Sequence, residues 1–402
     1  MMNRQTAREE RENSRIDYGI IFPIMMLALV GLASIYVAAS NDTKSVNVVR
    51  MVVTQLIWYV IGIGIVAVMM QFDSEQLWKI APYAYGFGIF LMIIILVFYS
   101  RAYYVQTGAK SWFAFGPFTF QPSEVMKPAF ILMAARAVRG HNDKYPQHTV
   151  QTDMLLLGKL ILWILPVLLS LHFQNDLGTT LVFLAILGGV ILVSGVTWKI
   201  LVPLISTVTV IGGTALAFVT TTWGRNILGR LGFKAYQFAR IDTWLNPSND
   251  TSSSSYQLWR SMKAIGSGQI FGKGFNHVEV YVPVRESDMI FSVIGENFGF
   301  IGSTLLILLY FLLIYQMIRV TFDTKNEFYA YISTGVIMMI LFHTFENIGM
   351  NIGLLPLTGI PLPFVSQGGS ALIGNLIGIG MIMSMRFHYH SYMFSADSEK
   401  FN

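Results

Sequence analysis

The chain has no cysteine among its 402 residues, and charged residues make up only 12% of it. Without cysteine, neither a disulfide framework nor a thiolate metal site can form. The seven histidines lack the spacing of a zinc enzyme, and no segment interleaves basic and aromatic residues as nucleic-acid modules do. These absences exclude disulfide-stabilised scaffolds and argue against zinc hydrolases and nucleic-acid-binding proteins.

Hydrophobic residues make up 54% of the chain, more than a soluble domain needs to fill a core. This composition predicts an all-α polytopic membrane protein, with residues 1–402 forming one integral membrane domain. About ten segments are long enough to span a bilayer as helices. They are residues 17–39, 51–71, 78–99, 122–139, 154–172, 177–195, 199–220, 288–318, 328–350 and 366–387.

The distribution of basic residues predicts the orientation of these helices. Ten spans place both termini on one side, and the short loops carry about 14 Lys and Arg on that side against about four on the other. The positive-inside rule therefore predicts cytoplasmic termini and, between the seventh and eighth helices, one long extracellular loop at 221–287.

Within this loop, Tyr256, Trp259, Met262 and Ile265 recur at helical spacing. The pattern is typical of an amphipathic helix that lies on the outer leaflet of the membrane. An ordinary loop helix packed on the bundle would produce the same pattern.

The segment 283–302 is the most informative stretch, because Arg285, Glu286 and Asp288 stand directly before a long apolar run. Ser287 is a suitable N-cap, which would place Asp288 in the first turn of a membrane helix. A carboxylate at the edge of the hydrocarbon is costly, so Asp288 is a candidate functional residue. The helix N-terminus and Arg285 are both expected to lower its pKa.

Two earlier motifs each allow a functional and a structural interpretation. In 108–113, Lys110 could meet a phosphate and Trp112 a sugar face, or both could anchor the chain at the membrane interface. Glu124 and Lys127 lie three residues apart on one helix face and can neutralise one another. Such a pair inside a span indicates a wet cavity or a purely structural contact.

Three further motifs are ambiguous in the same way. On chemistry alone, Asp176 is an N-cap for the sixth span. The glycine-rich stretch 266–274 lacks the strand and the Lys-Ser/Thr ending of a phosphate loop, so it predicts a flexible outer loop that carries Lys273. The ninth span bears a polar stripe that indicates interhelical hydrogen bonds, formed by His343, Glu346, Asn347 and Asn351.

The loop 359–370 combines two prolines with a run of five polar or small residues, 366–370, that opens the last span. Pro361 and Pro363 fix an extended backbone, while Gly368 and Gly369 permit the close approach of a ligand or of another segment. The N–H groups at the start of the last helix would suit an anion, and a tight turn without a ligand is the alternative.

Taken together, these motifs resemble the SEDS family (shape, elongation, division and sporulation), whose members are membrane glycosyltransferases that polymerise peptidoglycan. The resemblance covers nearly the whole chain. It is carried by Gly108-Ala-Lys-Ser-Trp112, Phe120-Gln-Pro-Ser-Glu124 with Lys127, Gln174-Asn-Asp-Leu-Gly-Thr179, Ala264-Ile-Gly-Ser-Gly268, Ser287-Asp-Met-Ile-Phe291, and Leu354-Leu-Pro-Leu-Thr-Gly-Ile-Pro-Leu-Pro-Phe364 with Gly368-Gly-Ser370.

The type within the family is indicated by two short motifs. Ser366-Gln-Gly-Gly-Ser370 and Phe345-Glu-Asn-Ile-Gly349 are more similar to the RodA (elongation) type than to the FtsW (division) type. Three positions depart from the family pattern: Asn175 replaces a proline, Gln269 replaces a glycine, and Asn297 stands where a second acid is common.

The resemblance implies that Asp288 is the catalytic residue and that Glu124 and Lys127 line a central cavity. It implies lipid II and an undecaprenyl-pyrophosphate-linked glycan as substrates, in a bacterial plasma membrane, with a class B penicillin-binding protein as partner. Lys110, Lys273 and Arg285 are candidates to meet the pyrophosphate, together with a divalent cation, Mg or Mn, whose ligands are unknown. The predicted substrate-binding set is Lys110, Trp112, Glu124, Lys127, Asp176, Lys273, Arg285, Glu286, Ser366, Gly368, Gly369 and Ser370.

Two other functions fit the same sequence. A lipid II flippase would use Glu124, Lys127 and the basic outer loop to guide a headgroup across the membrane, and Asp288 would be dispensable. A non-catalytic scaffold for a transpeptidase would tolerate any single change in the cavity.

Overall fold

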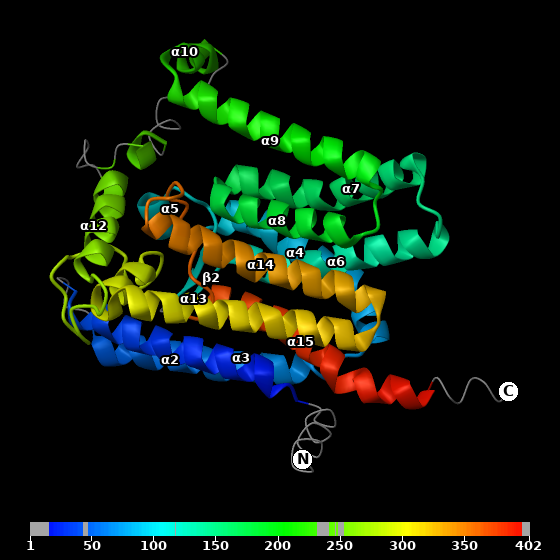
Figure 1. The fold of residues 1–402 in the computed structure, drawn as a ribbon, viewed down its shortest axis with the longest axis horizontal. Helices are drawn as coiled ribbons and strands as arrows, with labels where there is room; N and C mark the ends of the chain where they lie inside the picture. Colours follow the sequence, from blue (N-terminus) through cyan, green and yellow to red (C-terminus); the bar gives the residue numbers. More distant parts are fainter. Residues whose placement is uncertain are drawn as a thin grey trace.

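Long helices lie side by side in a bundle, and short elements gather at one of its ends (Figure 1). The structure, a computed structural model, describes residues 16–42, 47–116, 118–230, 241–245, 247 and 253–395. The long helices are α2 (Tyr18–Ser40), α3 (Val48–Met69), α4 (Ser74–Phe98), α6 (Pro122–Lys144), α7 (Val150–Gln174), α8 (Leu177–Val193), α9 (Trp198–Thr220), α13 (Ile290–Thr324), α14 (Glu327–Asn351) and α15 (Gly369–Ser395). The short elements are α5 (Arg101–Thr107), α10 (Thr222–Arg230), α12 (Ser253–Ser267), and an antiparallel hairpin of β1 (Phe113–Phe115) and β2 (Phe118–Phe120).

The predicted all-α membrane fold is confirmed. Among the described residues, eight helices are long and apolar enough to cross a membrane, namely α2, α3, α4, α7, α9, α13, α14 and α15. The other two predicted spans correspond to α6, which is too polar to meet this criterion, and α8, which is apolar but has only 17 residues. The count of ten spans stays a prediction.

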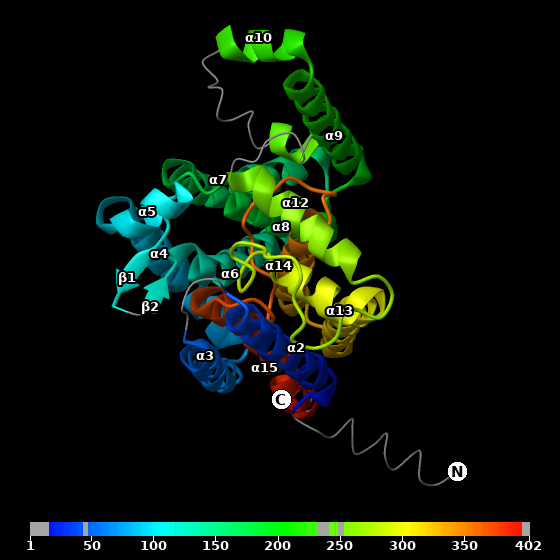
Figure 2. The ribbon, with the colours of Figure 1, turned by 90° about the vertical axis from the view of Figure 1, so that its left-hand side faces the viewer.

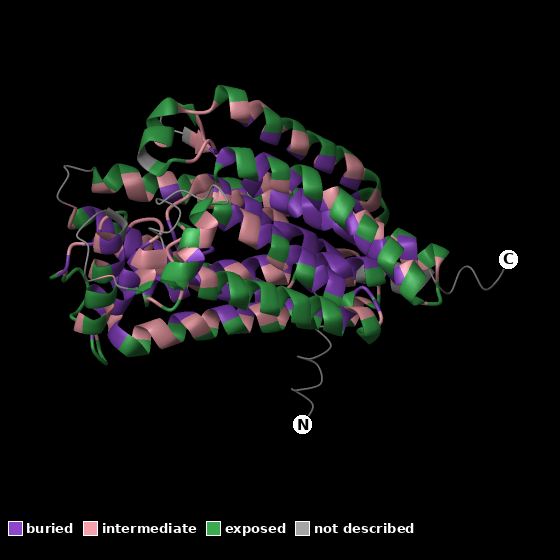
Figure 3. Cartoon of the chain, turned by 90° about the horizontal axis from the view of Figure 1, so that it is seen from above, coloured by how far each residue is buried: buried purple, intermediate pink, exposed green. Residues whose placement is uncertain are grey.

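The polar helix α6 lies at the centre of the bundle. It packs against α4, α7, α8, α14 and α15. The most apolar stretch of α15 is 72% buried, whereas that of α9 is only 6% buried. Figure 3 shows the same gradient, with buried residues concentrated in the middle of the bundle. This arrangement shields the charges of α6 from lipid, which is the condition for keeping them inside a membrane protein.

The bundle has two distinct ends. Helix α2 begins, and α15 finishes, at the end that we call the terminal end, on the right in Figure 1. Residues 268–289 lie at the opposite end, which we call the loop end and which faces the viewer in Figure 2. A hydrogen bond of 2.9 Å from Asn41 Nδ2 to Asn276 Oδ1 joins the last residues of α2 to this loop region.

Part of the predicted outer loop 221–287 packs on the bundle at the loop end. Helix α12 lies against α13 and α14, with Leu258, Ser261 and Ala264 fully buried. The expected apolar face packs only in part, since Ile265 lies against the core whereas Trp259 and Met262 are each 39% exposed. A position of α12 on the outer leaflet stays a prediction. Residues 1–15, 43–46, 117, 231–240, 246, 248–252 and 396–402 lie outside the described residues.

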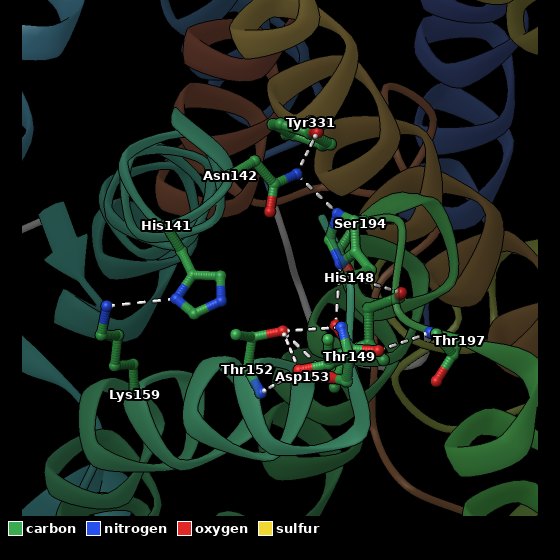
Figure 4. Close-up of polar contacts among 11 residues, drawn as sticks. His141, Asn142, His148, Thr149, Thr152, Asp153, Lys159, Ser194, Thr197 and Tyr331 are labelled. Atoms are coloured by element: carbon green, nitrogen blue, oxygen red, sulfur yellow. Dashed lines mark hydrogen bonds and ion pairs between the residues drawn. The ribbon is translucent and has the colours of Figure 1, made fainter. Parts of the chain in front are cut away.

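The connections at the terminal end are held by a polar network (Figure 4). The carboxylate of Asp153, fully buried at the start of α7, accepts from His148 Nδ1 at 2.7 Å and from a backbone N–H just before α9 at 2.9 Å. Asn142 Nδ2 on α6 donates to the carbonyl of Ser194 and to the hydroxyl of Tyr331, both at 3.0 Å. These contacts tie the α6–α7 connection to α8, α9 and α14.

Helix α13 is interrupted at Gly299, whose φ of 63° and ψ of −157° are not helical. The segment 268–274 docks on this break through main-chain hydrogen bonds, including Lys273 N to Glu296 O (2.8 Å) and Phe300 N to Gln269 O (2.9 Å). A Cβ at position 299 would lie 2.3 Å from Gly272 N. Only glycine combines this backbone conformation with so close an approach.

We expect Gly299→Ala to lower the thermal midpoint of the detergent-solubilised protein. The backbone strain alone costs about 1–3 kcal/mol, and the clash with the docked segment adds to it. The matched control is Gly64→Ala in α3, where a Cβ would meet no atom within 4 Å. Equal midpoints for the two variants would contradict this account of the break.

Candidate active site

Asp288 lies in a strap of turns, residues 284–289, that leads into α13 at the loop end. The predicted N-cap is wrong, because α13 begins at Ile290 and the residue before it, Met289, makes no side-chain capping bond. Val284 has a φ of 56°, and its carbonyl accepts from the amides of both Ser287 and Met289 at 3.3 Å. The tight turn leaves the Ser287 hydroxyl to donate to Asp288 Oδ1 at 2.7 Å.

Two asparagines of α14 hold the main chain of Asp288. Its carbonyl accepts from Asn347 Nδ2 at 2.8 Å and from Asn351 Nδ2 at 3.0 Å. Both asparagines are fully buried. The polar stripe predicted on this helix therefore does make hydrogen bonds, and the strap is one of its partners.

The two residues before Asp288 are held in the same way by the end of the loop that leads into α15. Ser366 Oγ donates to the carbonyl of Ser287 at 2.7 Å, and Gln367 N donates to the carbonyl of Glu286 at 2.9 Å. Three successive carbonyls of the strap are thus anchored to residues 347–367. The predicted site residue Ser366 acts here on the backbone of the strap.

The carboxyl group of Asp288 is only partly accessible and faces a glycine. A Cβ at Gly359, whose φ is +78°, would lie 3.3 Å from Asp288 Oδ2. Burial raises the pKa of Asp288 to about 6, opposed by the Ser287 hydrogen bond and reinforced by the charge of Glu286. The expected lowering by Arg285 is therefore not found.

The three cations expected near the pyrophosphate differ in their surroundings. Arg285 is only 3% exposed, and its guanidinium lies 5.5 Å from the centre of the Tyr281 ring. Lys273 forms an ion pair with Glu279 at 3.0 Å. Lys110 Nζ lies over the rings of two tyrosines at 5.2 and 5.9 Å, as expected of an interfacial anchor.

Glu124 and Lys127 form a closed ion pair inside the bundle, with both carboxylate oxygens 2.8 Å from Lys127 Nζ. Lys127 Nζ also lies 3.0 Å from His343 Nε2 of α14, which must accept because an ammonium only donates. All three side chains are at least 96% buried. Their role in lining a cavity stays a prediction. The sequence placed His343 in a polar stripe but gave no sign of this contact.

Asp176 caps α8, as the sequence predicted. Its Oδ1 accepts from Thr179 N at 3.0 Å, and its Oδ2 accepts from Gln121 Nε2 at 3.0 Å and Ser111 Oγ at 3.3 Å. The same turn touches the loop beside Asp288, since a Cβ at Gly178 would lie 3.1 Å from the carbonyl of Thr358. The carboxylate thus joins α8 to the segments around the hairpin.

The predicted close approach at Gly368 and Gly369 is present, and the group that approaches is a side chain of α3. A Cβ at Gly369 would lie 2.2 Å from the indole of Trp58. Gly368 N lies 3.4 Å from Gln55 Oε1 and donates to it. Gly369 therefore has a packing function, whereas a Cβ at Gly368 would meet only Ala371 Cβ at 3.8 Å. The binding of an anion at these glycines stays a prediction.

Ser370 and Trp112 both border the β1–β2 hairpin. Ser370 Oγ accepts from Gln121 N at 3.1 Å and donates to Thr119 O at 3.2 Å, while the carbonyl of Trp112 accepts from Ser100 N at 2.8 Å. Between the hairpin and the end of α4 lies an open, mainly apolar groove of about 690 Å³. It is lined by Leu91, Ile94, Phe98, Tyr99, Ser100, Phe113, Ala114, Phe115 and Phe120.

The three departures from the family pattern have local explanations. Asn175 caps the end of α7 with a φ of 61°, which asparagine tolerates better than most residues. Gln269 has a φ of 50°, a conformation better suited to glycine. Asn297 is buried, and its Nδ2 donates to Val293 O at 3.0 Å. A carboxylate at this position could not donate this hydrogen bond.

The expected divalent cation has no evident binding site. In the part of the chain that the structure describes, no group of three or more His, Asp or Glu side chains could hold a metal ion. We therefore assign no ligands to this cation.

Comparison with known proteins identifies the family. The model of the FtsW/RodA/SpoVE family, described as a cell cycle protein, matches residues 17–391. The chain belongs to this family. It is the SEDS family that the motifs indicated.

Relatives of several types match over nearly their whole length. The peptidoglycan glycosyltransferase MrdB of Escherichia coli (strain K12) is 32% identical over 91% of this chain and 93% of its own. The peptidoglycan glycosyltransferase RodA of Treponema pallidum (strain Nichols) is 28% identical over 92% and 98%. The stage V sporulation protein E of Bacillus subtilis (strain 168) is 28% identical over 92% and 96%.

Solved structures of SEDS proteins share the fold. A chain from a peptidoglycan synthase complex, described for its coordination of polymerization and crosslinking, superposes with a TM-score of 0.73 at 26% identity, covering 94% of this chain and 98% of that one. The rod shape determining protein RodA of Thermus thermophilus gives a TM-score of 0.64 at 26% identity, covering 93% and 98%.

We expect Lys127→Met to destabilise the protein strongly. It leaves the buried carboxylate of Glu124 without a counter-charge, and breaking a buried pair in this way costs about 3–5 kcal/mol. The double variant Glu124→Gln, Lys127→Met removes both charges and should recover much of the loss. Thermal midpoints in detergent test this, and a single variant as stable as the wild type would contradict it.

Proposed function

We propose that this SEDS protein is a peptidoglycan glycosyltransferase that polymerises glycan strands from lipid II during cell elongation. The observation that carries the proposal is the half-buried carboxyl group of Asp288, held at the loop end by three anchored carbonyls. The names of relatives such as MrdB and RodA support the same activity. The elongation role rests on the RodA-type motifs 345–349 and 366–370.

Asp288 is the general base of the transfer. Its carboxylate accepts the proton of the 4-hydroxyl of the acceptor GlcNAc as that oxygen attacks the anomeric carbon of the donor MurNAc. The bond from this carbon to the pyrophosphate oxygen breaks, and undecaprenyl pyrophosphate leaves with inversion to a β-1,4 linkage. Proton transfer to a positioned base typically contributes ~10²–10⁴ in rate.

The environment of Asp288 suits this role. A pKa of about 6 leaves the carboxylate ionised at neutral pH, yet more basic than an ordinary aspartate. The partly exposed carboxyl group lies beside Gly359, where any side chain would crowd it, since a Cβ there would lie 3.3 Å from Oδ2. Among the cations, Lys110 is the best placed to meet the leaving pyrophosphate, because Lys273 has a carboxylate partner and Arg285 is buried.

The apolar groove between α4 and the hairpin suits the polyprenyl tail of a lipid-linked substrate. It is open, and aromatic side chains dominate its lining. Lys110 lies over Tyr99, which lines this groove, so a pyrophosphate beside a tail in the groove would find a cation close by. One substrate could therefore reach the loop end from the bilayer without leaving it.

The chain is a multi-pass membrane protein, and we place its loop end outside the cell. The excess of Lys and Arg in the short loops on the terminal side favours this orientation. A class B penicillin-binding protein is the proposed partner, in line with the synthase complex that shares the fold. The charges of Glu124 and Lys127, which a flippase would use to guide a headgroup, are buried and pair with each other and with His343, and this favours a polymerase over a flippase.

We expect Asp288→Asn to reduce glycan polymerisation by at least ~10² while leaving the folded yield unchanged, because the amide cannot accept the proton. The measurement is the formation of polymer from lipid II on a glycan gel, with and without a class B penicillin-binding protein. The control is Asp323→Asn, the same change in the last turn of α13, where the carboxylate is partly exposed and pairs with Arg386. Polymerisation by Asp288→Asn at the wild-type rate would refute the assignment.

The raised pKa of Asp288 predicts the pH dependence of the reaction. The base works only when ionised, so kcat/KM should fall about tenfold per pH unit as the pH drops below about 6. Initial rates measured from about pH 4.5 to about pH 8 define this decrease at low pH, the acid limb of the profile. Rates that stay nearly constant down to about pH 4.5, as expected for an aspartate with the ordinary pKa of 3.8, would contradict the burial of the carboxyl group.

A further inference from the structure

One face of α14 carries three polar side chains at intervals of four residues, namely His343, Asn347 and Asn351. Residues four apart are neighbours on a helix surface, so the three form a continuous polar row. His343 contacts the enclosed Glu124–Lys127 pair. The two asparagines lie toward the loop end and contact the strap that carries Asp288.

Asn347 donates its two amide hydrogens to two segments that flank the Asp288 carboxyl group. Its Nδ2 donates to Asp288 O and to Ile360 O, each at 2.8 Å. Ile360 follows Gly359, the residue that faces Asp288 Oδ2. One fully buried amide therefore fixes the separation between the strap and the segment opposite the carboxyl group.

Asn351 supports the same arrangement from one turn further along the helix. Its Nδ2 donates to Asp288 O at 3.0 Å and to the carbonyl of Asn347 at 2.9 Å. Its Oδ1 accepts from Ser261 Oγ of α12 at 2.8 Å. The Asp288 carbonyl thus has two donors, whereas the Ile360 carbonyl has Asn347 alone as a side-chain donor among the contacts of the described residues.

Hydrogen bonds between buried polar residues usually join one transmembrane helix to another. Those of Asn347 end instead on two main-chain carbonyls in loops, next to the proposed base. We propose that Asn347 is a positioning residue for glycosyl transfer, which holds the Asp288 carboxylate at its working distance from the 358–360 segment. This inference rests on the proposal that Asp288 is the general base.

The effect expected from losing Asn347 is on turnover. A misplacement of about 1 Å at a reacting group can cost about 10²-fold in rate without abolishing binding. Asn347→Leu keeps nearly the same side-chain size, removes both donors and favours membrane insertion. We expect kcat to fall between ~10- and ~100-fold, with KM changed less than about threefold.

The matched control is Asn142→Leu at the terminal end (Figure 4). Asn142 also donates from one amide nitrogen to two acceptors, at 3.0 Å each, but it lies at the opposite end of the bundle from Asp288. We expect the two variants to lose similar thermal stability in detergent, while only Asn347→Leu loses kcat. If Asn347→Leu is not recovered folded, Asn347→Ser, which keeps one donor, should show a smaller loss of the same kind.

The pH profile separates positioning from a general loss of stability. A carboxyl group released from its clamp gains water, so the acid limb of kcat/KM should move to lower pH in Asn347→Leu and stay in place in Asn142→Leu. Glu286, on the strap itself, is the charged neighbour that acts on Asp288 and is unchanged in both variants. A merely structural role would reduce the amount of active protein without moving the limb.

The results of these assays separate the positioning role of Asn347 from the general-base role of Asp288. Wild-type kcat and an unmoved acid limb in Asn347→Leu, or an equal loss of kcat in Asn142→Leu, would overturn the positioning role and leave Asp288 as the base. Polymerisation by Asp288→Asn in the same assay would overturn the base itself.

Discussion

The candidate active site depends on a fixed backbone in the short strap of residues 284–289, which lies beside the membrane. A carboxyl group that is partly out of water loses solvation and is held only if its surroundings are well ordered. Here the order comes from main-chain carbonyls, since those of residues 286–288 each accept from a group in residues 347–367. The side chain of Asp288 is thereby left for chemistry, with the Ser287 hydroxyl as its one hydrogen-bond donor among the described residues.

The same constraint explains why the most polar of the long helices lies at the centre of the bundle. Helix α6 carries Glu124 and Lys127, and five other helices surround it. Lys127 Nζ contacts both carboxylate oxygens of Glu124 and the imidazole of His343, so each of the three hydrogens of its ammonium group has an acceptor. Because α14 supplies both this histidine and the two asparagines that hold the strap, one helix connects the enclosed charges to the loop end.

Helix positions followed closely from the sequence, because long apolar runs can satisfy their backbone in lipid only as helices. The helical spacing of Glu124 and Lys127 predicted their ion pair, and the chemistry of Asp176 predicted its cap. The start of α13 was wrong by two residues because the Ser287 hydroxyl bonds to its neighbour instead of capping the helix. That choice depends on a turn at Val284 with a positive φ, which β-branched residues rarely adopt.

Contacts between distant segments could not be read from the sequence. Gly369 carried a signal of close approach, but nothing identified Trp58 as the group that approaches. The charge of Arg285 suggested a role beside Asp288, but the sequence did not show that this side chain is buried beside Tyr281. The polar stripe of α14 was visible, whereas its carbonyl partners at residues 288 and 360 depend on how two loops fold back over the helix end.

The most direct test of this account is an infrared titration of the Asp288 carboxyl group itself, taken as the difference between the wild type and Asp288→Asn in detergent without substrate. The account predicts a protonated-carboxyl band that disappears as the pH rises through about 6. A group that titrates near 3.8, the ordinary value for an aspartate, would show that the carboxyl group is fully hydrated and that the strap does not hold it as described.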